Sequence, residues 1–64
     1  MPKTNVEVQL IGKDGNAFAI LGNVCGAMRD AGVDKDTIKE YQKEATSGDY
    51  DNLLRVTMKY VTVT

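Results

Sequence analysis

Val6-Glu7-Val8-Gln9-Leu10 is the stretch on which the predicted fold depends. Its apolar residues alternate with polar ones, which is typical of a β-strand that buries one face. A dense turn signal follows at once, Gly12-Lys13-Asp14-Gly15-Asn16. Beyond this turn the hydrophobic period changes from two residues to the period of a helix.

Three helices are predicted after the turn, each behind a residue whose side chain can accept from the amides of the first helical turn. The first runs from Ala17 to Ala31 behind Asn16 and ends at Gly32 in the left-handed conformation. The second begins behind Asp34, where Val33 and Ile38 form a hydrophobic staple, and the third begins behind residues 49–52. The expected buried faces are Phe18, Leu21, Val24, Cys25 and Met28, then Ile38, Tyr41 and Ala45, then Leu53, Leu54, Thr57, Met58 and Val61.

The tail, Tyr60-Val61-Thr62-Val63-Thr64, is β-branched and alternating, so we expect the third helix to give way to a short strand near Tyr60. The obvious partner of this strand is the first one. The predicted fold is therefore a single α+β domain over residues 1–64, in the order β-α-α-α-β, with three short helices packed on a two-stranded ribbon. We expect the ribbon to be antiparallel, although the pattern itself is silent on strand polarity.

Composition excludes several kinds of site. Cys25 is the only cysteine and the chain has no histidine, so neither an intramolecular disulfide nor a zinc cage can form. Cys25 also lacks a base and falls on the apolar side of a helix, where core packing is its expected role. We therefore expect no catalytic residue, no metal site and no cofactor. The net charge is −1 and the basic residues are scattered, without the basic face of a nucleic-acid-binding protein.

Location follows from hydrophobicity. No stretch approaches the roughly 20 apolar residues of a membrane span. The first residues lead into a strand instead of an apolar signal core. We therefore expect no membrane association and a cytoplasmic location.

Two further patterns leave alternatives open. Asp49 and Asp51 could serve acid–base chemistry or bind calcium, but helix capping explains both, and we favour the cap. Gly22 and Gly26, with Ala19, form a strip of small residues inside the first helix. Such a strip permits close backbone approach, and we favour an internal contact with another helix over contact with another molecule.

Several stretches stand out as motifs: Leu10 to Phe18, Leu21-Gly22, Ala31-Gly32-Val33 and above all Glu44 to Asp51 (EATSGDYD). Together they resemble a family of small uncharacterised proteins of bacteria and their phages and mobile elements, from about Val8 to Val61. Family members often carry histidine at the position of Asn52 and tryptophan at that of Tyr60, so no role for a histidine there carries over. The resemblance implies origin and compactness, and no activity.

The helices also show a weaker likeness, in the spacing of Met28 to Val33, Ile38, Ala45, Gly48-Asp49 and Leu53-Leu54. This spacing resembles that of ubiquitin-associated (UBA-like) three-helix domains, with Gly32-Val33 in place of their Gly-aromatic loop. The likeness implies a protein-binding surface in preference to an active site.

These observations predict a non-enzymatic protein-interaction module, an accessory protein of a phage or mobile element, whose protein partner is unknown. A weak nucleic-acid-binding accessory protein is the alternative, suggested by the helical pair Arg55 and Lys59. A homodimer is also expected, because a small core and a ribbon with open edges are marginal alone. The predicted contact surface consists of Asp14, Asn16, Tyr50, Asp51 and Arg55; Tyr50 either anchors an interface or folds back onto Ile38 and Tyr41.

Overall fold

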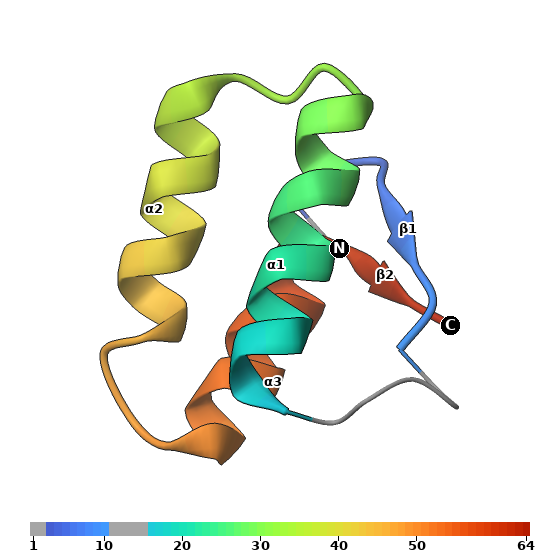
Figure 1. Ribbon diagram of the computed structural model, residues 1–64. Coiled ribbons are helices and arrows are strands. Elements are labelled where there is room, and N and C mark those ends of the chain that lie inside the picture. Colours follow the sequence, from blue (N-terminus) through green and yellow to red (C-terminus); the bar gives the residue numbers. More distant parts are fainter. Residues whose placement is uncertain (1–2, 11–15) are drawn as a thin grey trace.

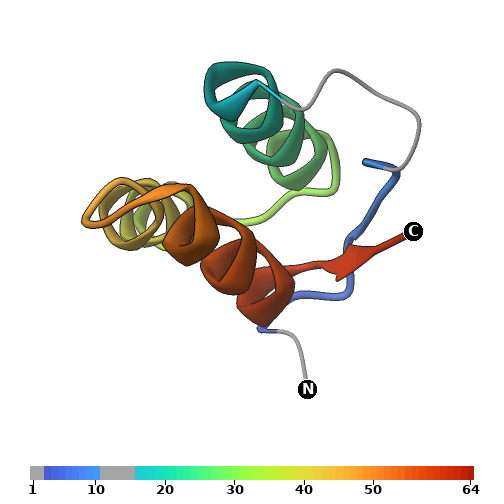
Figure 2. The same ribbon diagram turned by 90° about the horizontal axis from the view of Figure 1, so that it is seen from below.

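The computed structural model describes residues 3–10 and 16–64 (Figure 1). Over these residues the chain forms β1 (Glu7–Val8), α1 (Ala17–Asp30), α2 (Lys35–Ala45), α3 (Tyr50–Tyr60) and β2 (Thr62–Val63). The fold is α+β and mostly helical, as predicted. Viewed from below, α2 lies on the side away from the sheet (Figure 2). Only α1 and α3 contact the described strands, so the expectation that all three helices pack on the ribbon is wrong.

The two strands run parallel, with Glu7 opposite Thr62 and Val8 opposite Val63, so the expected antiparallel ribbon is wrong. The reason lies in the helices between them, which alternate in direction (Figure 1). An odd number of alternating helices returns the chain to the end of the molecule where β1 begins. There the amide of Lys3 donates to the carbonyl of Lys59 at 2.9 Å, which sets α3 beside the start of the N-terminal segment.

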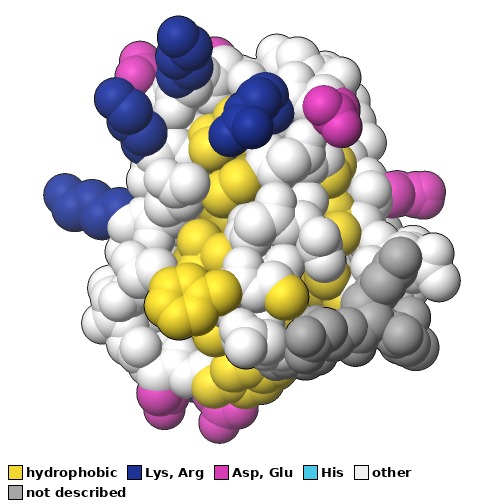
Figure 3. All heavy atoms as spheres, viewed as in Figure 1, with side chains coloured by type: hydrophobic (Ala, Val, Ile, Leu, Met, Phe, Trp, Pro, Cys, Tyr) yellow, Lys and Arg dark blue, Asp and Glu magenta, His cyan; other side chains and the backbone are white. Residues whose placement is uncertain are grey.

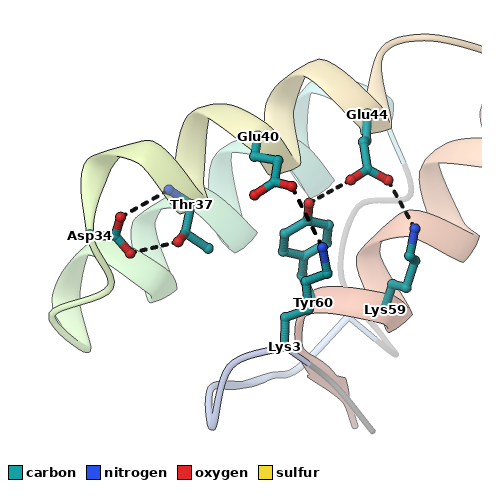
Figure 4. Close-up of polar contacts among 7 residues, drawn as sticks. All are labelled: Lys3, Asp34, Thr37, Glu40, Glu44, Lys59 and Tyr60. Atoms are coloured by element: carbon teal, nitrogen blue, oxygen red, sulfur yellow. Dashed lines mark hydrogen bonds and ion pairs between the residues drawn. The ribbon is translucent and has the colours of Figure 1, made fainter.

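Local capping chemistry sets the starts of the helices as predicted. Asn16 Oδ1 accepts from the amide of Phe18 at 2.8 Å, and Asp49 Oδ1 accepts from the amide of Asn52 at 3.0 Å. Asp34 caps α2 by accepting from both the hydroxyl and the amide of Thr37, at 2.6 and 3.3 Å (Figure 4). The hydrogen bond from the Thr37 hydroxyl lowers the pKa of the Asp34 carboxyl group.

The predicted end of the first helix is also confirmed, because Gly32 has a φ of 84°. The amide of Val33 donates to the carbonyl of Met28, and that of Gly32 to Arg29, which is the Schellman pattern. The glycine strip is different. A Cβ at Gly22 or Gly26 would meet no described atom within 4 Å, so the expected internal close approach is wrong.

These glycines give a matched pair of stability measurements. Gly32→Ala is expected to lower the free energy of unfolding by about 1–2 kcal/mol, because a Cβ is strained at positive φ. Gly22→Ala is expected to raise it by up to about 1 kcal/mol, because alanine is the better helix former and the space is open. Urea denaturation followed by circular dichroism measures both. A stabilised Gly32→Ala protein would contradict the left-handed turn.

The core is built from both ends of the chain and all described helices. Val6 and Val8 are buried while Glu7 and Gln9 are exposed, as the alternation predicted. Tyr41 and Tyr60 lie at its centre, fully buried, with ring centroids 5.4 Å apart in an edge-to-face arrangement. Cys25 is buried too, and its sulfur accepts from Gln42 Nε2 at 3.3 Å, which confirms its packing role.

Two residues predicted for the core are not in it. Phe18 is 87% exposed and Met58 is 56% exposed. Ile20 and Val56 are buried in α1 and α3, although the predicted faces omitted them. In both helices, therefore, the predicted buried face only partly overlaps the face that packs against the other elements.

Candidate functional site

An apolar hollow of about 280 Å³ opens where the start of α1 meets the end of α2 and the start of α3. Hydrophobic side chains gather in a band on this face of the molecule, and acidic side chains lie at its lower end (Figure 3). Lys and Arg side chains lie toward the opposite, upper end, where other acidic side chains also lie (Figure 3). The described residues around the hollow are Ala17, Phe18, Leu21, Ala45, Thr46, Gly48, Asp49, Tyr50 and Leu53.

Large apolar side chains at the edge of this hollow face water. Phe18 is 87% exposed and Tyr50 is 45% exposed, while Leu21 between the rim and the core is partly buried. Single exposed apolar residues are ordinary, but a group of them around a concave surface marks a contact site. The hollow is therefore the strongest candidate for a functional surface among the described residues.

Phe18 lies away from the middle of the buried face of α1. At 3.6 residues per turn, Phe18 lies about 160° around α1 from Ile20 and about 120° from Val24. Those two residues are buried at 3% and 0% exposure, so they define the inward face. Cys25, only about 20° around the helix from Phe18, is nevertheless buried at 5% exposure. The exposure of Phe18 therefore also depends on its place in the first turn of α1, at the rim of the hollow.

Side-chain hydrogen bonds fix the turn between α2 and α3, which supplies Thr46, Gly48 and Asp49 to the lining of the hollow. In the turn between α2 and α3, Asn52 Nδ2 and Ser47 Oγ both donate to the carbonyl of Glu44, at 2.9 and 2.7 Å. Thr46 Oγ1 donates to the carbonyl of Gln42 at 2.7 Å. A Cβ at Gly48 would approach the Asn52 side chain to 3.0 Å, so this turn is closely packed. A partner would meet a preformed surface.

The structure brings together part of the predicted contact surface. Tyr50 lines the hollow, and Asn16 caps the helix turn that carries Phe18, so segments more than thirty residues apart meet here. Asp51 is exposed in the first turn of α3, directly after Tyr50. Arg55 is exposed on α3 but does not line the hollow. Asp14 lies outside the described residues.

A second group of polar side chains joins α2 to the end of α3 (Figure 4). Glu44 accepts from the Tyr60 hydroxyl at 2.7 Å and from Lys59 Nζ at 3.0 Å. Lys3 Nζ lies 4.9 Å from the centre of the Tyr60 ring and 3.6 Å from Glu40. This group ties the N-terminal segment, α2 and α3 together around the buried Tyr60.

The same contacts move the pKa values of this group away from neutrality. The hydrogen bond from Tyr60, followed by that from Lys59, lowers the pKa of the Glu44 carboxyl group. Burial, followed by the hydrogen bond to Glu44, strongly raises the pKa of the Tyr60 phenol. A general acid or base works best with a pKa near the operating pH, and neither group has one. The arrangement is structural in character.

A larger hollow, of about 600 Å³, lies between residues 3–6 and the turn that joins α1 to α2. Several of its polar side chains have partners within the chain: Thr4 donates to the carbonyl of Tyr60, and Asp34 caps α2. None of the large, exposed apolar residues lies in its described lining. It therefore has less of the character of a contact site than the apolar hollow.

The described residues contain no group of three or more His, Cys, Asp or Glu side chains placed to hold a metal ion. None of the described helices has the length and hydropathy that crossing a membrane requires. In comparisons with known proteins, no family model, no curated protein and no solved structure matches this chain.

Proposed function

We propose that this protein is a small non-enzymatic protein-interaction module, and that the apolar hollow with Phe18 and Tyr50 is its contact surface. The observation that carries the proposal is the exposure of Phe18, 87%, at the rim of a concave apolar surface. Aromatic residues are enriched among the anchors of protein interfaces. The hydrogen-bonded turn beneath supports the proposal, because a rigid surface loses less entropy on binding.

The polar chemistry of the chain supports a role without catalysis. Cys25 is buried against Gln42, and the Glu44 and Tyr60 side chains satisfy each other. Weak nucleic-acid binding has less support, because Lys59 of the predicted basic pair forms an ion pair with Glu44 at 3.0 Å. The motif from Glu44 to Asp51 supports an accessory role in a phage or mobile element, with a larger cytoplasmic protein as partner.

Replacing Phe18 tests this proposal. Phe18→Ser is expected to leave stability within about 0.5 kcal/mol of the parent protein, because the side chain is already in water. It is expected to weaken capture of the partner from the native host at least tenfold, the scale of about 1.4 kcal/mol for a lost anchor. Affinity capture followed by quantitative mass spectrometry measures this loss.

Met58→Ser is the matched control, because Met58 is also an exposed apolar residue on a helix but lies outside the hollow. It is expected to capture the same partner as the parent protein. Equal capture by the Phe18 and Met58 variants, with both folded by circular dichroism, would show that the hollow is not the contact surface.

A further inference from the structure

The charge around the apolar hollow specifies what kind of partner it fits. Asp49 is the one charged residue in its described lining. Asp51, two residues further along, is exposed in the first turn of α3. Both are aspartates, and the Lys and Arg side chains of the described residues on this face lie toward the far end of the molecule (Figure 3). A partner at the hollow therefore meets an apolar surface with a negative edge.

The size of the hollow argues against a large interface. A stable protein–protein interface covers about 800 Å² and about 20 to 30 residues on each side. The whole described surface of this chain is 4294 Å², so such an interface would need about a fifth of it. The hollow, with a volume of about 280 Å³, offers room for one or two large side chains. It matches the mode in which a short helix lays a few apolar residues into a groove.

A second copy of this chain fits the hollow poorly. In a twofold dimer the same patch meets itself. Both copies would then bring Asp49 and Asp51 to the interface, with no cation from the described lining of either hollow to balance them, and like charges across an interface oppose association. The homodimer expected from the sequence would have to use another surface.

We infer that the hollow binds a short amphipathic segment of another protein, in which one or two large apolar side chains stand next to lysine or arginine. This inference rests on the proposed function and deepens it by naming the chemistry of the partner. The apolar side chains occupy the space between Phe18, Leu21 and Leu53. The cations lie against Asp49 and Asp51, where they also set the orientation of the segment.

Probe peptides test the inference directly. The first is a helical peptide of about 12 residues with leucine and phenylalanine at i, i+4 spacing and lysines beside them. The second replaces each lysine by glutamate, and the third replaces the apolar anchors by serine. Each is titrated into the ¹⁵N-labelled protein. The lysine peptide is expected to shift the amides of residues 17–21 and 48–53, to bind at least tenfold more tightly than the glutamate peptide, and to weaken as salt is added.

Variants separate charge from stability. Asp51→Asn is expected to remove a large part of the preference for the lysine peptide. Asp36→Asn is the matched control, because Asp36 is likewise an exposed acid in the first turn of a helix, α2, but the hollow meets the other end of that helix. It is expected to leave the preference unchanged, and circular dichroism shows that both variants are folded.

Several outcomes would overturn the inference. One is equal binding of the lysine and glutamate peptides, and another is a set of shifted amides away from the hollow. Concentration-dependent shifts of the same amides without peptide, with a doubled mass by light scattering, would identify a second copy as the occupant. These outcomes concern only the chemistry of the partner. The proposed function is tested separately, by the capture experiment with Phe18→Ser.

Discussion

Tyr41→Ala is expected to lower the free energy of unfolding by about 3–5 kcal/mol, as large aromatic truncations in a core do. That is most of the stability of a domain of this size, for which about 3–10 kcal/mol is usual. Tyr41 is fully buried in α2, packs edge-to-face on Tyr60, and its hydroxyl hydrogen-bonds the Thr57 hydroxyl at 2.8 Å. The alanine variant removes all three interactions and leaves a cavity between α2 and α3. Urea denaturation, or loss of the folded signal at 25 °C, measures the effect.

Two controls separate packing from hydrogen bonding. Tyr41→Phe keeps the ring and is expected to lose about 1–2 kcal/mol, because the buried Thr57 hydroxyl then has no phenol to pair with. Tyr50→Ala removes the same kind of side chain at a position that is 45% exposed, and is expected to lose less than about 1 kcal/mol. Similar losses for Tyr41→Ala and Tyr50→Ala would contradict the central position of Tyr41.

Thr62→Pro is expected to lower the free energy of unfolding by about 2–3 kcal/mol, because the carbonyl of Val6 loses its donor and the strands separate. The amide of Thr62 donates to that carbonyl at 2.9 Å, and the amide of Thr64 donates to the carbonyl of Val8 at 2.9 Å. These bonds hold β2 against β1 and cover the buried valines. Thermal unfolding and amide hydrogen exchange at residues 6–10 measure the loss.

Val63→Pro is the matched control, because the described bonds between the strands use the amides on either side of Val63. It introduces the same ring one residue away and is expected to cost about 1 kcal/mol or less. If the order of the two proline variants were reversed, the parallel register of Glu7 with Thr62 would be wrong.

The success of the sequence prediction depended on how local each feature is. Helix starts at Asn16, Asp34 and Asp49 were predictable, because a cap is formed by a side chain and an amide two or three residues apart. The left-handed Gly32 was predictable for the same reason. The buried stripe of α2, Ile38, Tyr41 and Ala45, was also predicted in full, since no other apolar residue of that helix competes with it.

The stripes of α1 and α3 were predicted only in part. Each helix carries more apolar residues than one neighbour can cover, so periodicity alone allows two or more centres for the buried face. The packing of α1 against β1 and α2 selects Ile20 and Val24, which leaves Phe18 outside. In α3, Val56 and Tyr60 are buried, and Met58 is exposed to water.

In the candidate site, too, local features were predictable from the sequence and the contacts between distant segments were not. Tyr50 and Asn16 were predicted as contact residues from their local character, an aromatic and a cap in polar segments. Nothing in the spacing of residues 18, 21 and 50 indicates that they share one hollow, because that proximity depends on how α1 is placed against the turn between α2 and α3.

The sequence by itself determined the three described helices, their caps, the class of the fold and which ends of the chain pair. Each of these follows from contacts within a few residues or from the hydrophobic period. Tertiary structure alone decided the direction of β2, the exposure of Phe18 and the acidic edge of the apolar hollow. These depend on the relative placement of whole helices, which is a balance of many distant contacts that no short stretch of sequence contains.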